Sequence, residues 1–303
     1  MDHEEALTAK VAWYYYCQGL TQQQISDRLG IGRMRIVKLL DRARRTGVIR
    51  FHLREGSAER TELERKLIDG FGLSDAFVIP SDENPDRCNA NIAEGASMYL
   101  IERIRKDTVI NIGYGDTLNR VLNKLAAMTE DPVTCVSLTG GVSPYLPDSQ
   151  TSAFNAHLRL IPAPLLASSS EMAKAMLQEE SIAGILRMIP LSQLTVVGIG
   201  SMDESATIFR GGLLNQNDLA YLKMRGAVGD LLSHFLTREG DLVESPVENR
   251  LIGTSLPTMR SLPLVIGVAA GLVKAEAIRA VLRGRYLSVL ITDDQTAEKI
   301  LSF

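Results

Sequence analysis

The sequence predicts an α/β protein in two parts. A helix-turn-helix domain of winged-helix type is expected over residues 1–55, and a doubly wound, Rossmann-like body over residues 56–303. Helical patterns separated by glycines occupy the start of the chain, and apolar runs alternate with helical patterns after it. Charge is also unevenly divided: residues 1–55 hold ten Lys/Arg against six Asp/Glu, a net charge of +4, so the remainder carries −7 in a chain of net −3. A basic head on an acidic body indicates that the head alone contacts a polyanion.

The composition excludes several classes of protein. A hydrophobic fraction of 45% and a charged fraction of 23% are typical of a folded globular chain. No apolar run approaches the roughly 18 residues of a membrane span, and the acidic N-terminus lacks the pattern of a signal peptide. Cys17, Cys88 and Cys135 are scattered, which fits a reducing compartment and gives no metal pattern. We therefore expect a cytoplasmic protein without a membrane partner, a metal or a cofactor.

Two helices are predicted at the start of the head. Residues 6–18 have helical spacing, and Gly19 is well placed to end this helix. Thr21 and Gln24 have the spacing of a capping box at the start of a helix over residues 22–29. The apolar side of the first helix is expected to hold Val11, Trp13, Tyr14 and Tyr15.

A third helix, over residues 33–46, completes a helix-turn-helix pattern and ends at Gly47. Gly30 stands where the turn needs a positive φ, and Ser26 is small where the two helices cross. The five apolar core positions of the motif are occupied by Ile25, Leu29, Ile31, Ile36 and Leu39. The combination of core, small residue and turn glycine favours a DNA-binding motif over a chance match.

The third helix carries six Lys/Arg and one acidic residue, Asp41, between positions 33 and 45. A helix face that is merely solvated usually mixes charges of both signs, so this bias favours DNA reading over that alternative. Base edges are expected to meet Arg33, Met34, Val37 and Lys38, and phosphates to meet Arg35, Arg42, Arg44 and Arg45. Thr21 and Gln22, at the start of the second helix, complete the candidate DNA interface.

Two segments join the head to the body. Residues 48–53 alternate as a short β-wing strand would, although a simple connector strand accounts for this nearly as well. Residues 59–71 place Leu63, Leu67 and Phe71 on one helical face, which predicts a linker helix.

In the body, apolar strands alternate with helices, which predicts a parallel sheet covered on both faces. Strands are expected at residues 76–80, 108–112, 134–138, 158–162, 194–198, 264–268 and 287–292. Helices are expected at residues 89–105, 116–128, 171–179, 182–188, 274–283 and 295–301.

Glycine-containing loops follow three of these strands, at residues 112–117, 138–142 and 197–201. In such sheets ligands bind at the carboxyl ends of strands, where loop amides and helix N-termini accept anions. These loops predict a site for a phosphate or a polyol. The alternative is that each glycine only turns a strand into a helix. None of the loops matches GxGxxG or GxxxxGK[ST], so no nucleotide cofactor is expected.

The chain resembles the SorC family of sugar-binding bacterial transcriptional regulators from end to end. The similar segments include "GLTQQQISDRLGI", "GYGDT", "LTGGV", "LIPAPL", "VVGIGS", "GAVGDLL", "FLTREGDLV" and "KAEAIRAVLRGRYLSVLITDDQTAEKIL". Within the family it is most similar to the repressors that respond to the phosphorylated autoinducer-2 quorum signal. The resemblance implies a body of the sugar-isomerase fold, a tetrameric assembly and release by a phosphorylated sugar.

The resemblance also implies the residues of an effector pocket. Lys274 would supply a charge for a phosphate, and Asp230 would accept hydrogen bonds from sugar hydroxyls. The alternatives are a solvated Lys274 and an Asp230 that only caps a turn. The full implied set is Gly113, Tyr114, Gly115, Asp116, Thr117, Thr139, Gly140, Gly141, Gly198, Gly200, Ser201, Asp230 and Lys274.

The chain departs from the family at both ends. Gly32 stands where a serine is common, and Val37-Lys38 where Ser-Arg is common, so the preferred operator sequence is expected to differ. Ala269-Ala270-Gly271 replaces a paired glycine ahead of Lys274, which puts the shape of the pocket in question.

Two other functions compete with regulation. An isomerase or deaminase body would need an acid–base pair near a sugar carbonyl. The body offers only His157 and His234, both expected to be structural, and Asp116, which suits a helix N-terminus without any catalytic role. A redox sensor would use a cysteine, but Cys135 lies in an apolar strand and Cys17 on the apolar side of a helix. We therefore expect a protein that is not an enzyme.

The expected mechanism is that of a homo-oligomer, a dimer or tetramer, on a palindromic double-stranded operator. A sugar phosphate, or alternatively an unphosphorylated sugar alcohol, would bind one quaternary state preferentially and shift the population of the DNA-competent form.

Overall fold

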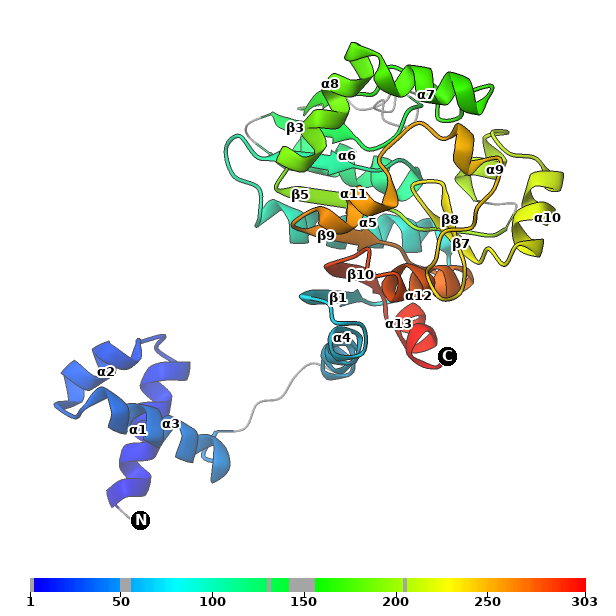
Figure 1. Cartoon of the computed structure of the whole chain (residues 1–303). Coiled ribbons are helices and arrows are strands. Elements are labelled where there is room, and N and C mark those ends of the chain that lie inside the picture. Colours follow the sequence, from blue (N-terminus) through cyan, green and yellow to red (C-terminus); the bar gives the residue numbers. More distant parts are fainter. Residues whose placement is uncertain (1–2, 50–55, 130–131, 142–155, 204–205) are drawn as a thin grey trace. The chain divides into compact units, whose positions relative to one another are not determined.

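The chain packs as two separate units, Met1–Ala58 and Glu59–Phe303 (Figure 1). The computed structural model describes residues 3–49, 56–129, 132–141, 156–203 and 206–303. Among the helices that it describes, none combines the length and apolarity needed to cross a bilayer.

Three helices form the head: α1 (His3–Tyr16), α2 (Gln22–Leu29) and α3 (Arg33–Arg45). The predicted capping box is present, because Thr21 Oγ1 accepts from the amide of Gln24 at 3.2 Å and Gln24 Oε1 accepts from the amide of Thr21 at 2.8 Å. Gly30 ends α2 with φ of 65°, and the Ser26 hydroxyl donates to the carbonyl oxygen of Ile31 at 2.7 Å. Ser26 therefore does more than leave space, since it ties the turn to the end of α2.

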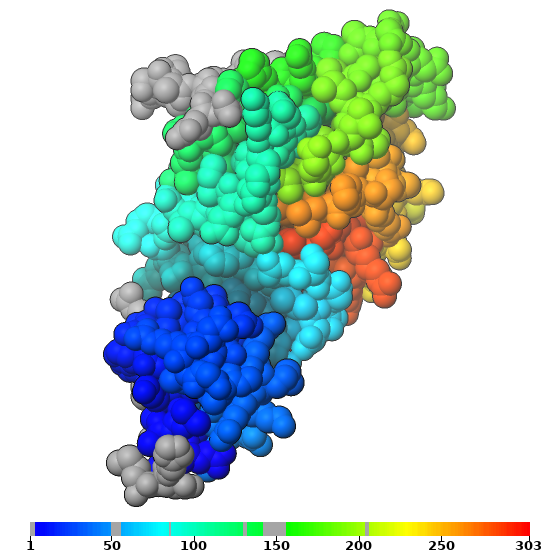
Figure 2. Space-filling model, turned by 90° about the vertical axis from the view of Figure 1, so that its left-hand side faces the viewer, coloured from blue at the N-terminus to red at the C-terminus, as the bar shows by residue number. Residues whose placement is uncertain are grey.

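The core of the head confirms the predicted pattern, with one error. The five predicted positions pack together with Val11, Tyr14 and Leu40. Trp13 is 51% exposed, because it lies two residues from Val11, roughly 200° around the helix. In the space-filling view the head, in blue, is a single rounded unit (Figure 2). The predicted wing at 48–53 mostly lies outside the described residues, and Val48 and Ile49 form a bend.

A seven-stranded parallel sheet forms the centre of the body, in the order β1-β10-β9-β5-β2-β3-β4. All seven predicted strands are present, and the fourth begins two residues before the expected 158. Their bounds are β1 (Asp75–Ile79), β2 (Val109–Ile112), β3 (Val133–Ser137), β4 (Ala156–Arg159), β5 (Leu194–Val197), β9 (Val265–Val268) and β10 (Val289–Asp293).

Helices cover both faces of this sheet, as its apolar strands require. Val196 packs into a core with α5 (Pro85–Ile101) and α6 (Asp116–Met128), whereas Val197 packs into the opposite core with α4 (Ser57–Phe71), α12 (Ala275–Arg283) and α13 (Asp294–Leu301). The remaining predicted helices are α7 (Ser170–Gln178) and α8 (Glu180–Met188). This two-sided packing confirms the doubly wound fold.

Two of the helix starts that differ from the prediction concern the cavity described below. Helix α5 begins four residues before the expected 89, because Asn84 caps its N-terminus and Pro85 occupies its first turn. Lys274 belongs to a short 3₁₀ turn, η4 (Leu272–Lys274), rather than to α12. Lys274 therefore stands just before the helix and close to its free amides.

Several short elements were not predicted. A three-stranded antiparallel sheet lies beside the main sheet, in the order β6-β7-β8. The unpredicted elements are β6 (Gly200–Ser201), β7 (Gly229–Leu231), β8 (His234–Leu236), α9 (Thr207–Arg210), α10 (Gln216–Met224), α11 (Leu256–Ser261), η2 (Ile189–Leu191) and η3 (Glu248–Arg250).

Candidate functional site

The outer surface of α3 is basic and exposed. Ile36, Leu39 and Leu40 face the core, so the opposite side of the helix is left to solvent. Met34 is 70% exposed and Val37 is 37% exposed, so the outward side of the helix includes apolar as well as basic side chains. The other exposed candidates on this helix are Arg33, Arg35, Val37, Lys38, Arg44 and Arg45. Thr21 is exposed and Gln22 half-buried at the start of α2.

Two of the candidate phosphate contacts on α3 are held by acidic partners. Arg42 is paired with Glu4 of α1 at 2.8 Å and is only half-buried, and Arg45 is paired with Asp41 at 2.8 Å. The other four basic side chains of α3 form no ion pair within the described part of the chain. A phosphate would therefore have to replace a carboxylate at Arg42 and Arg45, whereas the remaining four positions carry uncompensated positive charge.

A cavity of about 590 Å³ lies at the carboxyl end of the main sheet. The segments that follow β1, β10, β9, β5 and β2 contribute to its wall, as expected for a ligand site in a sheet of this kind. Of the residues implied for the pocket, nine line it: Tyr114, Gly115, Asp116, Thr117, Gly198, Gly200, Ser201, Asp230 and Lys274.

Four residues implied for the pocket are not among those that line the cavity. Gly113 lies behind the wall, where its amide donates to Val196 and its Cα faces the side chain of Leu232. Thr139 is 1% exposed and Gly140 packs against the backbone of Pro164. The amides of Gly140 and Gly141 donate to the carbonyl oxygens of Ile252 and Ala163, so the loop after β3 holds other loops in place.

Asp230 is buried on β7, opposite Gly200 of β6. Its Oδ2 accepts from the amide of Ser233 at 2.9 Å, so Asp230 both lines the cavity and caps its own hairpin turn. That turn is Leu232-Ser233, with φ of 55° and 70°, a conformation that residues other than glycine seldom adopt. Burial raises the pKa of Asp230, while the Ser233 amide and the charges of Lys274 and His234 oppose this rise.

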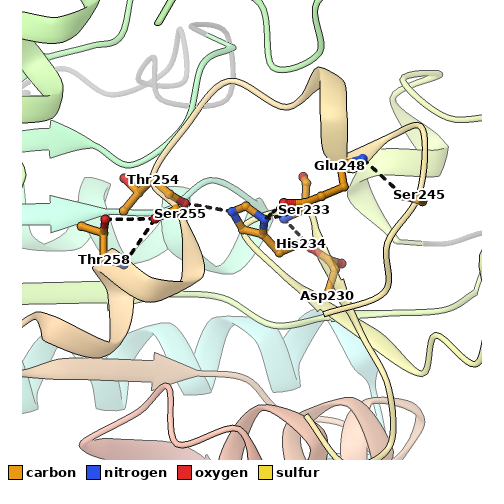
Figure 3. Close-up of polar contacts among 8 residues, drawn as sticks. All are labelled: Asp230, Ser233, His234, Ser245, Glu248, Thr254, Ser255 and Thr258. Carbon is orange, nitrogen blue, oxygen red and sulfur yellow. Dashed lines mark hydrogen bonds and ion pairs between the residues drawn. The ribbon is translucent and has the colours of Figure 1, made fainter. Parts of the chain in front are cut away.

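Hydrogen bonds hold the strained turn in place from two sides, and Figure 3 shows those made by Asp230 and His234. The Ser233 hydroxyl shares a hydrogen bond of 2.6 Å with the hydroxyl of Tyr114, which lines the cavity. The buried ring of His234 contacts the Glu248 carboxylate through Nδ1 at 2.9 Å and the Thr254 carbonyl oxygen through Nε2 at 2.9 Å. Oxygen atoms thus face both ring nitrogens. His234 fixes the hairpin from behind and does not line the cavity, as expected for a structural histidine.

Lys274 lines the cavity and is half-buried. Burial lowers the pKa of Lys274, and the charges of Asp230, Asp203 and Asp116 act in the opposite direction. Within the described residues its ammonium group makes neither a hydrogen bond nor an ion pair with any of these carboxylates. A partly buried ammonium group retains three donors, so an oxygen-rich ligand in the cavity would satisfy them.

Sequence reasoning missed part of the wall. Asn89, on α5, accepts a long hydrogen bond of 3.5 Å from the Thr117 hydroxyl, and Arg120 is paired with Asp116 at 3.0 Å. The other missed polar residues include Ser81, Arg210, Asp293 and Gln295. Ser81 and Asp293 stand at the carboxyl ends of β1 and β10, so the same rule that selected the glycine loops would have found them.

The residues of the site give little support to the two alternative functions, an enzyme and a redox sensor. No histidine is among the described residues that line the cavity, and His157 is exposed on the edge strand β4. Cys135 is buried, and burial raises the pKa of its thiol to about 12. Cys17 is exposed, which corrects its expected place on an apolar face. Cys88 is buried and lines the cavity, where desolvation raises the pKa of its thiol. Thiols with a raised pKa, as at Cys88 and Cys135, are poor nucleophiles.

Comparison with known proteins shows similarity along the whole chain. The Sugar-bind family, described as a sugar-binding domain, matches residues 57–302. The chain is 35% identical to the transcriptional regulator LsrR of Klebsiella pneumoniae, over 99% of the chain and 94% of that protein. It is 34% identical to LsrR of Escherichia coli K12, over 98% of the chain and 95% of that protein.

Solved structures give the same result. The full-length sorbitol operon regulator SorC from Klebsiella pneumoniae is 26% identical with a TM-score of 0.70, and the match covers 99% of this chain and all of that one. A DeoR family transcriptional regulator from Listeria monocytogenes is 27% identical with a TM-score of 0.71, over 80% of this chain and 99% of that one.

Proposed function

Because the chain belongs to the SorC family of sugar-binding transcriptional regulators, we propose that it represses a carbohydrate or quorum-signal operon and is switched by a phosphorylated sugar. It is a DNA-binding regulator with a sugar-binding body, which the match to the sugar-binding family and the similarity to the transcriptional regulators LsrR and SorC support.

The unpaired ammonium of Lys274 carries the phosphate part of the proposal. A phosphate would accept from this group and from the first amides of α6, whose N-cap residue Gly115 offers no side-chain cap. The buried carboxylate of Asp230 would accept from sugar hydroxyls at the other side of the same cavity. The cavity volume of about 590 Å³ is in the range usual for small-molecule sites.

The head would act as one of a pair. A homo-oligomer would place two copies of α3 in successive major grooves of a palindromic operator, with Arg33, Met34, Val37 and Lys38 at base edges. Thr21, Gln22, Arg35, Arg42 and Arg45 would contact the phosphate backbone. Sugar phosphate binding to one quaternary state would then shift the population between the DNA-bound and free forms.

An unphosphorylated sugar alcohol is the second candidate, because carboxylates surround Lys274. Asp116 and Asp230 line the cavity, and their charges, with that of Asp203, oppose the lowering of the pKa of Lys274 by burial. Carboxylates accept readily from hydroxyls and repel a phosphate. This cluster of negative charge is the specific observation in favour of a neutral polyol.

A thermal-shift panel separates the two candidates, because a ligand that binds only the folded state raises the Tm. The panel consists of D-ribose 5-phosphate, D-fructose 6-phosphate, sorbitol 6-phosphate, sorbitol and inorganic phosphate. A rise with sugar phosphates alone supports the proposal, and a rise with sorbitol alone supports the second candidate. Gel shifts with the DNA upstream of the protein's own operon, with and without the stabilising compound, then test the regulatory function. No binding to that DNA would contradict the proposal.

A further inference from the structure

Asp294 connects a wall of the cavity to helix α4. Its Oδ1 accepts from the amide of Ser81 at 3.0 Å, and Ser81 lines the cavity. Its Oδ2 lies 4.0 Å from the guanidinium of Arg60 on α4. The two side chains of this pair are 22% and 27% exposed, whereas Arg65 on the same helix is 60% exposed in its pair with Glu62. Water therefore screens the pair of Arg60 and Asp294 less than it screens the pair of Arg65 and Glu62, although the charged atoms lie farther apart, at 4.0 Å against 2.7 Å.

The position of Asp294 follows from the end of the sheet. Strands β1 and β10 run in parallel with Ile79 opposite Asp293, and β10 continues directly as α13. The regular ladder therefore ends there, and the carboxylate of Asp294 takes the next available amide of the β1 side, that of Ser81. The loop after β1 is thus held to the first turn of α13 by one side chain.

The neighbouring carboxylate holds a second wall of the cavity. Asp293 caps α13 by accepting from the amide of Thr296 at 2.7 Å, and its Oδ2 also accepts from the amide of Gly271 at 2.9 Å. Gly271 begins the turn that ends at Lys274. Adjacent carboxylates at the start of α13 therefore attach both the Lys274 turn and the Ser81 loop to the same short segment.

We propose that the start of α13 transmits the occupancy of the cavity to α4 through the pair of Asp294 and Arg60. This proposal rests on the proposed function and adds its route of regulation. A ligand that draws Lys274 or Ser81 toward itself displaces the first turn of α13, and with it the charge that faces Arg60. Arg60 lies in the first turn of α4, three residues after Ser57, and the chain before α4 leads to the head. The interaction between Arg60 and Asp294 then has a different free energy in the ligand-bound and ligand-free states. Coupling between the cavity and α4 requires such a difference.

Two conservative variants test the route. Arg60→Gln removes the positive charge and keeps a polar side chain. Asp294→Asn removes the negative charge and keeps an oxygen that can accept from the Ser81 amide. Arg65→Gln is the matched control, because Arg65 lies on the same helix and its ion pairs with described residues are to exposed acids of that helix, Glu62 and Asp69.

The measured quantity is the ratio of operator Kd values with and without the panel compound that most stabilises the wild type. Allosteric ratios are typically about 5- to 150-fold. Arg60→Gln and Asp294→Asn are each expected to reduce the ratio at least about threefold, and the double variant to reduce it no further, because both remove the same pair. Compound affinity and compound-free operator affinity should stay within about twofold of the wild type, and Arg65→Gln should keep the wild-type ratio.

The other possible results distinguish a failure of the proposed function from a failure of the route. A wild-type ratio of one would overturn the proposed function, and the route with it. A normal wild-type ratio that survives in both single variants would overturn the route alone. Losses that add in the double variant would show that Arg60 and Asp294 do not act as a pair. A parallel loss of compound affinity would place these two residues in the binding site. Either result would also overturn the route.

Discussion

A β-carbon on Gly200 would overlap Oδ1 of Asp230, its partner across the β6–β7 pair. The absence of a side chain at Gly200 therefore leaves the space that the buried carboxylate occupies. Gly198, two residues earlier, also lines the cavity, but a β-carbon there would meet nothing closer than 3.7 Å. The two glycines of "GIG" thus have different roles, although they look alike in the sequence.

Gly200→Ala is expected to displace the Asp230 carboxylate. Overpacking a filled site costs about 1–3 kcal/mol of the free energy of unfolding, and the displaced carboxylate should weaken effector binding by about tenfold. Urea denaturation and thermal-shift titration with the panel compound measure the two effects. Gly198→Ala is the control and should change neither by much, so equal behaviour of the two variants would refute the role assigned to Gly200.

Asp230→Asn should weaken effector binding and raise the stability of the fold. Burial raises the pKa of Asp230 above that of the unfolded chain, so the ionised carboxylate lowers stability at every pH above the unfolded value of about 3.9. That cost disappears as the pH falls through the raised folded pKa. We expect the variant to have a higher Tm than the wild type at neutral pH, a smaller difference in mild acid, and effector affinity lower by about tenfold or more. A Tm difference that does not change with pH would contradict this reading of Asp230.

Lys274→Met should abolish the response to a phosphorylated effector. The substitution keeps an unbranched side chain but removes the ammonium, and a hydrogen bond to a charged group is worth about 1.5–3 kcal/mol, or about 10- to 100-fold in affinity. Operator affinity without effector should stay unchanged. Lys124→Met, on α6 and paired with Glu94, is the control for loss of a lysine outside the cavity. Calorimetric titration with the panel compound gives the affinities, and an unchanged affinity would remove Lys274 from the site.

Arg33→Ala and Arg45→Ala should differ in kind. Arg33 stands at the start of α3, where base edges are read, so its loss should cost about 1–3 kcal/mol on operator DNA and relax specificity. Arg45 lies in the last turn and is already paired with Asp41, so its loss should weaken all DNA binding modestly and lower the salt slope by about one at most. Binding to operator and random duplexes over a range of salt concentrations measures both. If Arg33→Ala weakened both duplexes equally, base reading by Arg33 would be excluded.

Elements with a strong local pattern could be predicted from the sequence, and those without it could not. Helix α6 was expected at its observed bounds, because Gly115 and Asp116 mark its start and a buried apolar stripe runs to Ala126. The small sheet was missed because β6 spans two residues and β7 three, whereas alternation marks a strand only over about four residues or more. The position of Asp230 depends on this sheet, so its burial was beyond local reasoning.

The loop after β3 shows a different limit. The rule that placed Tyr114 and Gly198 at the cavity also favoured Gly140 and Gly141, since each follows a strand of the same sheet. Whether these two glycines face the cavity depends on where chain segments far away in the sequence lie, because the carbonyl oxygens of Ile252 and Ala163 accept hydrogen bonds from their amides. The basic charge of α3 could be predicted from the sequence, whereas the pairing of Arg42 with Glu4 depends on the packing of α1 against α3.

The contact between α4 and the sheet has one more consequence. Strand β1 is an outermost strand of the seven-stranded sheet, and the carboxylate of Glu64 on α4 accepts from the amide of its Val78 at 2.8 Å. An uncovered strand edge is a template on which another polypeptide can add a strand. Helix α4 thus keeps the body from associating edge to edge. A shortened body that began after Phe71 would lose this protection and would be prone to aggregate.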